Sequence, residues 1–260
     1  MKNMKIISWN VNGIRACVKK GFLEYLKNSQ VDMICLQETK IAIEDLDDLI
    51  KDPPGYYGIW HSAERKGYSG TAILTKHKPL SVTEGFGNPK YDCEGRVTMA
   101  EYDDFYLFSV YFPNGQKDET RLQYKLEFYR DFFEYCEDLR TTGKGLVICG
   151  DYNTAHYPID LARPKENEGT SGFLPIERDW MDKIVKMGYV DTFRLFNQDP
   201  NNYSWWSYRT RARERNIGWR IDYTFVNDTF KDKVSSAFID AEILGSDHCP
   251  VGITLNLNGQ

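Results

Sequence analysis

The sequence lacks any long hydrophobic run. Within its 260 residues there is no stretch of about 18 consecutive apolar residues, and no charged segment followed by an apolar one precedes KIISWN near its start. These absences argue against a membrane-spanning helix and a secretory signal peptide. We therefore expect a soluble, intracellular, cytoplasmic protein with no membrane partner.

Cysteine is present but never occurs at metal-binding spacing. None of the six cysteines belongs to a C-x-x-C pair, which argues against a structural zinc site. Cys35 and Cys149 lie inside apolar runs. We therefore expect free, buried thiols in a protein of a reducing compartment.

An excess of positive charge is also absent, since the formal net charge is -5. The total charge thus gives no sign of a nucleic-acid partner. An acidic total can still conceal a basic face, so the local distribution of charge matters more than the sum.

No linker, low-complexity segment or obvious internal repeat divides the chain. Its hydrophobic content of 41% is enough to bury a large core. We therefore predict a single domain over residues 1–260.

Short runs rich in β-branched and aromatic residues alternate with segments of helical period. The spacing of apolar residues predicts a helix over 119–140, with Asp118 as its N-cap, a second over 176–188 and a weaker one over 18–29. Loops are expected at 47–58 and 162–173. Many strands with a few helices predict an α/β layered sandwich. The predicted strands are 5–10, 32–38, 70–76, 96–102, 105–112, 145–153, 221–227, 235–242 and 250–257.

Several of these strands end in acids or amides. The bland interpretation is that Asp and Asn favour the turn after a strand, and it is the better one for any single residue. It is a poor account of the whole set, because gathered acids repel one another unless a cation compensates. Oxygen ligands with one histidine indicate Mg²⁺ or Mn²⁺. The set comprises Asn10, Asn12, Glu38, Asp151, Asn153, Asp222, Asp247 and His248.

A second cluster combines arginine with tryptophan. Residues 203–223 contain five arginines, interleaved with Trp205, Trp206 and Trp219, and lead directly into Asp222. Guanidinium groups beside aromatic faces are typical of contacts with phosphate backbones and unstacked bases. The alternative is a solvated arginine run beside core tryptophans. The direct connection to Asp222 favours nucleic acid.

Seven short motifs are spread along the chain: SWNVNGIRA, LQETK, GYSGTAIL, YFPNG, GDYNTAH, GWRIDY and SDHCP. Their order and spacing are those of the exonuclease III family of AP endonucleases, and the chain resembles the archaeal and bacterial branch of that family from about residue 5 to 257. The resemblance implies the endonuclease/exonuclease/phosphatase fold, a four-layer α/β sandwich with two central mixed β-sheets flanked by helices, as one catalytic domain.

The resemblance also implies an activity. Members hydrolyse the phosphodiester 5′ to an abasic site in duplex DNA, leaving a 3′-hydroxyl and a 5′-deoxyribose phosphate. A 3′→5′ exonuclease or 3′-phosphodiesterase activity is common among them. We therefore expect a Mg²⁺-dependent DNA repair enzyme, with Mn²⁺ as an alternative metal, that acts as a monomer on damaged double-stranded DNA.

Residue roles carry over from the motifs as expectations. Glu38 matches the principal metal ligand, Asp247 lies near the same metal region, and Asn10 supports it. Asn12 stands where some members carry an aspartate, which makes a second metal position less secure. Asp151 matches the aspartate that orients or deprotonates the attacking water. His248 would donate to a phosphate oxygen, with Asp222 holding its imidazole, and the remaining phosphate contacts would be Asn153, Tyr111 and Asn114.

Substrate recognition is expected from a pocket wall and from backbone contacts. Trp205, Trp219 and Ile221 match the apolar wall that accepts a flipped sugar without a base. Arg209 stands where some relatives carry an apolar residue that enters the DNA helix. The expected backbone contacts are Arg15, Lys66, Tyr68, Arg209 and, more weakly, Lys117.

Three alternatives remain open on the sequence alone. Some relatives in this branch cleave at deoxyuridine, so a deoxyuridine-directed endonuclease is one alternative. A general nuclease or a phosphatase on the same fold shares the acidic motifs, although a small-molecule phosphatase has no use for an arginine-flanked tryptophan pocket. A damage-binding protein without catalysis is disfavoured by the complete acidic set.

Overall fold

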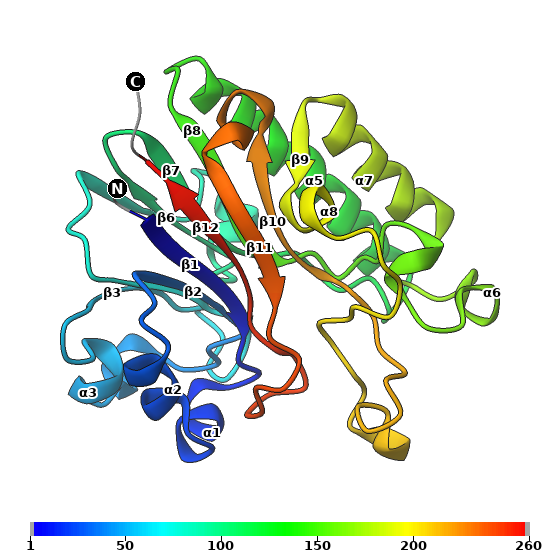
Figure 1. The fold of residues 1–260 in the computed structure, drawn as a ribbon, viewed down its shortest axis with the longest axis horizontal. Helices are drawn as coiled ribbons and strands as arrows, with labels where there is room; N and C mark the ends of the chain where they lie inside the picture. Colours follow the sequence, from blue (N-terminus) through cyan, green and yellow to red (C-terminus); the bar gives the residue numbers. More distant parts are fainter. Residues whose placement is uncertain (1–2, 258–260) are drawn as a thin grey trace.

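The computed structural model describes residues 3–257, and its strands form two six-stranded mixed sheets (Figure 1). The first sheet has the order β11-β12-β1-β2-β4-β3, and the second has the order β5-β6-β7-β8-β10-β9. The first comprises β1 (Asn3–Asn10), β2 (Met33–Gln37), β3 (Tyr57–His61), β4 (Thr71–Thr75), β11 (Val234–Ile239) and β12 (Val251–Asn256). The second comprises β5 (Ser81–Glu84), β6 (Val97–Glu101), β7 (Phe105–Tyr111), β8 (Gly145–Asp151), β9 (Tyr189–Asp191) and β10 (Asp222–Asn227).

Helices and short 3₁₀ turns occupy the segments between the strands. The helices are α1 (Ile14–Lys19), α2 (Phe22–Asn28), α3 (Asp48–Lys51), α4 (Pro89–Asp92), α5 (Glu119–Arg140), α6 (Pro164–Asn167), α7 (Pro175–Lys186) and α8 (Thr192–Phe196). The 3₁₀ turns are η1 (Ile43–Asp45), η2 (Pro158–Asp160), η3 (Arg209–Arg211) and η4 (Asp228–Lys233).

The two sheets pack face to face, with helices on both outer faces (Figure 1). Successive residues of a strand point to opposite faces, so each strand feeds two cores. Ile6 lies in the core between the sheets with Val147, whereas Ile7 packs under the α1–α2 layer and Ile148 packs under α5 and α7. Because both faces of these strands are buried, their sequences are nearly continuous apolar runs. The expected four-layer α/β sandwich is confirmed.

The long helix α5 has the bounds and the cap that the sequence predicts. The side chain of Asp118 accepts a hydrogen bond from the Arg121 N–H at 2.8 Å, which satisfies one of the unpaired donors of the first turn. Its buried face is largely aromatic and packs on the second sheet through Phe128 and Phe132. This layer covers the side of β8 that faces away from the first sheet.

Three strands and four short helices, α3, α4, α6 and α8, were missed by the sequence prediction. β3, β5 and β9 were not predicted, and β5 is mostly exposed at an edge, where alternating hydrophobicity is weak. The expected loop at 47–58 contains α3 and the start of β3, and the loop at 162–173 contains α6. The helix expected over 18–29 is two helices, because Gly21 adopts φ 101° between them.

The topology brings several strand ends to one edge of the molecule. β1 runs parallel to β2, and β7 runs parallel to β8, so their C-terminal ends meet there. Asp151 at the end of β8 pairs in register with Asp222 at the start of the antiparallel β10. The candidate site is therefore built on rigid strand ends.

No helix within residues 3–257 is both long enough and apolar enough to cross a membrane.

Candidate active site

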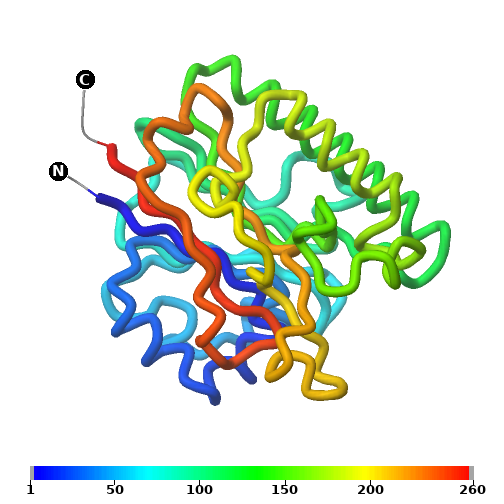
Figure 2. Tube along the Cα trace, turned by 45° about the vertical axis from the view of Figure 1, so that its right-hand side comes forward, coloured from blue at the N-terminus to red at the C-terminus, as the bar shows by residue number. Residues whose placement is uncertain are grey.

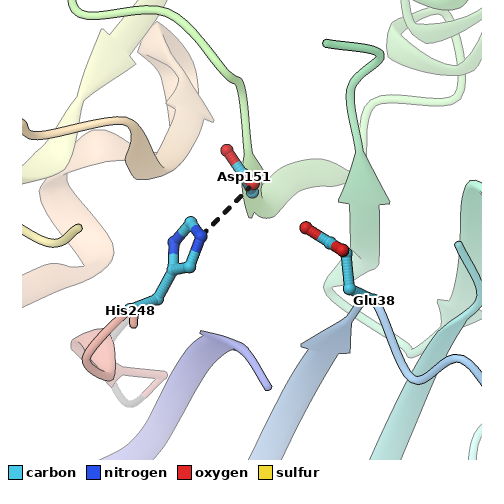
Figure 3. A group of neighbouring side chains, drawn as sticks. All are labelled: Glu38, Asp151 and His248. Carbon is cyan, nitrogen blue, oxygen red and sulfur yellow. Dashed lines mark ion pairs between the residues drawn. The ribbon is translucent and has the colours of Figure 1, made fainter. Parts of the chain in front are cut away.

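Asn10 connects two carboxylates that come from different sheets. Its side-chain N–H group donates to Glu38 Oε1 at 2.8 Å and to Asp151 Oδ2 at 2.9 Å. Ligand atoms of Glu38, Asp151 and His248 lie within 4.8 Å of one another (Figure 3). Three residues far apart in sequence thus form a candidate metal-binding cluster.

Glu38 is held as a carboxylate despite its burial. Lys40 Nζ lies 2.7 Å from Glu38 Oε2, while Asn10 occupies the other oxygen. Burial opposes ionisation, but the Lys40 ammonium and the Asn10 amide together lower the pKa of Glu38 below its usual value. Glu38 therefore carries a negative charge at neutral pH at the end of β2.

The pKa of Asp151 is shifted in the opposite direction, above its usual value. Burial and the neighbouring charge of Asp222 raise the pKa of Asp151 to about 7, with a further contribution from Glu38 and a partial offset from His248. A carboxylate whose pKa lies near neutral pH is suited to accept a proton in a reaction at that pH.

His248 is oriented by Asp222. Its Nδ1 lies 2.8 Å from Asp222 Oδ2, and its Nε2 lies 3.9 Å from Asp151 Oδ2. Burial disfavours the charged ring, but Asp222 overcomes this effect and raises the pKa of His248 to about 10. The imidazolium can then donate from both nitrogens, which makes His248 a hydrogen-bond donor more than a metal ligand.

Asp247 and Asn12 lie next to the cluster and bond to each other. Asn12 Nδ2 donates to Asp247 Oδ1 at 2.9 Å, and Asn12 Oδ1 accepts a hydrogen bond from Lys40 Nζ. The second Asp247 oxygen accepts from Trp205 Nε1 at 3.1 Å. These contacts, with the charge of His248, lower the pKa of Asp247 against the effect of burial. Both side chains belong to a hydrogen-bond network beside Glu38.

The predicted phosphate contacts line the same cavity as His248. Asn153 Nδ2 donates to the Phe112 carbonyl at 2.9 Å, and Asn153 Oδ1 accepts from Asn114 at 3.1 Å. Asn153 adopts φ 50° in the turn that follows β8. Tyr111, at the end of β7, lines the same cavity as these two amides.

The cluster opens into a pocket of about 570 Å³. Trp205, Trp219 and Ile221 line it together with Glu38 and His248. The two tryptophan rings meet edge to face, with centroids 6.4 Å apart. The predicted apolar wall and the predicted acidic cluster are thus parts of one cavity.

The predicted backbone contacts lie outside this cavity. Arg15, Lys66, Lys117 and Arg209 are exposed. Tyr68 is half-buried, and its hydroxyl accepts hydrogen bonds from Arg96 at 2.8 Å and Arg121 at 2.7 Å. Arg15 and Lys117 each lie 3.8 Å from a carboxylate oxygen, of Asp45 and Asp118 respectively, whereas Tyr68 is fixed by its own arginines.

Three residues of the site were not singled out by the sequence analysis. Lys40 ends the motif LQETK, so its place in the motif was a usable signal. Ser204 donates to Asp222 Oδ2 at 2.7 Å, and its only signal was its position before the tryptophans. Arg96 donates to the Tyr111 carbonyl at 2.9 Å; nothing in its local sequence pointed to the site.

Residues 7–248 match the model of the Endonuclease/Exonuclease/phosphatase family. The chain belongs to this family of hydrolases, and it is an enzyme. It is 44% identical to an exodeoxyribonuclease of Bacillus subtilis over 256 residues, which cover 98% of this chain and 100% of that protein. It is 43% identical to a DNA-(apurinic or apyrimidinic site) endonuclease of Dictyostelium discoideum, covering 98% of this chain and 71% of that protein.

The fold is also shared with a solved DNA complex. The 3′ phosphatase NExo from Neisseria, bound to a product DNA hairpin, superposes with a TM-score of 0.90 at 26% identity, covering 97% of this chain and 99% of that chain. The resemblance to the exonuclease III family is confirmed.

Proposed function

We propose that this protein is a DNA repair endonuclease that hydrolyses the phosphodiester 5′ to an abasic site in duplex DNA. The products are a 3′-hydroxyl and a 5′-deoxyribose phosphate, and 3′→5′ exonuclease and 3′-phosphodiesterase activities accompany the incision. One observation carries the proposal. The cluster of Glu38, Asp151 and His248 opens into the same cavity as the wall of Trp205 and Trp219.

The roles of the side chains follow from their protonation and position. Asp151, with its raised pKa, takes the proton of the attacking water. His248, charged and fixed by Asp222, donates to a non-bridging phosphate oxygen as negative charge develops there. Asn153, Asn114 and Tyr111, which line the same cavity, also hold the phosphate. Loss of a central donor is expected to lower the rate by about 10²–10³.

The donor set fits Mg²⁺. Glu38 offers an ionised carboxylate, and Asp151, the proton acceptor, lies within 4.8 Å of it, whereas His248 is engaged by Asp222. Few carboxylate ligands suit a hard cation that keeps several waters and binds phosphate oxygens, and Mn²⁺ satisfies the same set. When bound, the cation would stabilise charge on the phosphate and on the departing 3′-oxygen.

The cavity and its surroundings suit a flipped sugar in duplex DNA. Trp205, Trp219 and Ile221 offer an apolar wall that a deoxyribose without a base can contact. Arg15, Lys66, Lys117 and Arg209 would meet backbone phosphates, with Tyr68 beside them. We include a monomeric state and an intracellular location in this proposal.

Incision of a labelled duplex with one tetrahydrofuran abasic analogue tests the proposal. Wild-type protein with Mg²⁺ is expected to cut 5′ to the analogue, and EDTA is expected to abolish cutting while leaving much of the DNA binding. His248→Ala is expected to lower the rate by about 10²–10³ because it removes a donor to the developing charge.

A parallel duplex with deoxyuridine tests the alternative substrate, in a preparation shown to lack glycosylase. Cutting there as well would widen the substrate class. A folded wild-type protein that leaves the analogue intact would contradict the proposal and favour phosphatase substrates.

A further inference from the structure

The five arginines between residues 209 and 220 divide into two groups. Arg209, Arg211 and Arg215 are exposed. Arg220 is buried and contacts Asp160 and Asp191. Arg213 is half-buried, and its guanidinium points inward to the main chain of a neighbouring loop. The cluster is therefore not one uniform phosphate-binding surface.

Arg213 crosslinks two loops through main-chain carbonyls. Its Nη1 donates to Ser246 O at 3.1 Å, and its Nη2 donates to Ala241 O at 2.7 Å and to Ile243 O at 2.6 Å. The guanidinium also stacks over the ring of Trp206, with its central carbon 4.6 Å from the ring centroid. These three hydrogen bonds and the ring contact require a planar guanidinium group with several donors and a weakly hydrated face. The single ammonium group of a lysine cannot make the same set of contacts.

The loop that Arg213 holds leads directly into the catalytic side chains. Ser246 precedes Asp247 and His248, and it is buried. Further bonds join the same two segments, since Trp206 N–H donates to Asp247 O at 3.0 Å and Cys249 N–H donates to Ser204 O at 2.8 Å. Both segments lie at the same end of the molecule, away from the turn η4 (Figure 2). A shift of Arg213 would therefore be transmitted to the backbone of His248.

We propose that Arg213 is a positioning residue that docks the arginine-rich loop on the loop carrying Asp247 and His248, and that it acts on the chemical step without contacting DNA phosphate. This inference rests on the proposed function. It assigns opposite roles to neighbouring arginines: Arg209 faces outward to the DNA backbone, whereas Arg213 fixes the orientation of His248 from within. In the sequence, Arg213 looks like one more cation of the arginine cluster. In the structure it links the DNA-facing loop to the reacting groups.

Two readouts separate the roles. The first is the single-turnover incision rate of the tetrahydrofuran duplex with enzyme in saturating excess. The second is the slope of log binding constant against log salt concentration, measured with EDTA present. A phosphate-contacting arginine contributes about one to the salt slope, and a positioning arginine contributes nothing to it.

Arg213→Met is expected to lower the single-turnover rate by about 10- to 100-fold, as small misplacements of reacting groups do, and to leave the salt slope at the wild-type value. Arg209→Gln is expected to flatten the slope by about one. Lys231→Met removes the same charge from the exposed turn η4 and is expected to match wild type in both readouts. All assays are run well below the melting temperature of each variant, so that a purely stabilising role would not alter the rate.

Arg213→Lys keeps the charge and replaces Arg213→Met in both measurements if Arg213→Met does not fold. It is expected to show the wild-type salt slope with a lowered rate, because it lacks the planar fork. A flattened slope with an unchanged rate in either variant would overturn the inference, as would an unchanged rate with an unchanged slope. Failure of the wild-type protein to incise would instead contradict the proposed function.

Discussion

The imidazole of His248 contacts two acids in different ways. Nδ1 makes a hydrogen bond to Asp222, whereas Nε2 stays 3.9 Å from Asp151 on the side of the pocket. Asp222 is itself fixed by Ser204, whose oxygen also accepts from the main-chain N–H groups of Ile221 and Asp222 at 3.1 Å each. One hydroxyl therefore sets the position of the carboxylate that orients the histidine.

Ser204→Ala tests this arrangement. The change leaves two main-chain donors unpaired in a buried place, so the free energy of unfolding is expected to fall by about 1–3 kcal/mol. The incision rate is expected to fall as well, because Asp222 loses its fixed position. Urea denaturation and single-turnover incision measure the two effects. Ser235→Ala, at a surface hydroxyl on β11, is the control; equal behaviour of the two variants would show that Ser204 has no part in the site.

Glu38→Gln tests the metal site at the residue scale. The amide keeps the size of the side chain but removes the ionised carboxylate, so the Mg²⁺ concentration for half-maximal incision is expected to rise by at least about 10-fold. Excess Mg²⁺ should restore part of the activity. A Mg²⁺ titration of the incision rate measures this, with the exposed Glu134→Gln on α5 as control. An unchanged midpoint would remove Glu38 from the set of metal ligands.

At the scale of elements, a buried ion pair joins α5 and α7 beneath the site. Lys125 Nζ lies 2.6 Å from Glu177 Oε1 and donates to the Asn153 carbonyl at 2.7 Å. Both side chains are 0% exposed. Glu177 also accepts from the main chain of Gly172 and Leu174 at the start of α7. The pair fixes the turn after β8 against the loop that lines the pocket.

Lys125→Met is expected to destabilise the fold by about 3–5 kcal/mol, because it leaves the Glu177 charge buried without its partner. Lys125→Met with Glu177→Gln should recover part of that loss, since the unpaired charge is then removed. Chemical denaturation measures both. The half-exposed pair of Lys90 and Glu127 provides the comparison, and Lys90→Met is expected to cost less than about 1 kcal/mol. Similar losses for Lys125→Met and Lys90→Met would contradict this account.

At the scale of the whole molecule, a second buried network ties the end of the second sheet together. Asp160 Oδ1 accepts from Arg220 Nε at 2.8 Å and from Arg194 Nη2 at 2.6 Å, and Arg220 reaches Asp191 at 2.7 Å. Burial opposes the ionisation of Asp160, but Arg220 and then Arg194 lower the pKa of Asp160 below its ordinary value of 3.8. The contribution of this carboxylate to stability is therefore complete above that value and is lost as pH falls through the lower, folded-state pKa.

Asp160→Asn is expected to lower the free energy of unfolding by about 3–5 kcal/mol at pH 7. The difference from wild type should narrow below about pH 4, because wild type then loses the same carboxylate by protonation. Urea denaturation from pH 7 to pH 3 measures the difference. Asp103→Asn, at an exposed carboxylate, is expected to show little change across this range. A difference that widens toward acid pH would contradict the assignment.

Much of the fold could be predicted from the sequence because its elements leave local signals. The apolar runs at 5–10 and 145–153 are buried on both faces, and the helical spacing and cap of 119–140 are complete within the segment. β5 and β9 escaped prediction because they are short edge strands, whose pairing with β6 and β10 is decided by the neighbouring strand. α3 escaped because its single turn lies among Pro, Gly and charged residues, which are typical of a loop.

The sequence by itself determined which residues form the acidic set and, through its motifs, the family. Their separate roles, with Asp222 beside His248 and Asp247 in the metal region, came only from the resemblance of the motifs, because nothing in composition or spacing distinguishes the two aspartates. Tertiary structure placed Asp222 behind His248 and Asp247 against Asn12 and Trp205. It likewise turned Arg213 inward and left Arg209 outside. The physical reason is that each of these partners lies on another loop or strand, and a polar side chain takes its role from the partner that the fold brings to it.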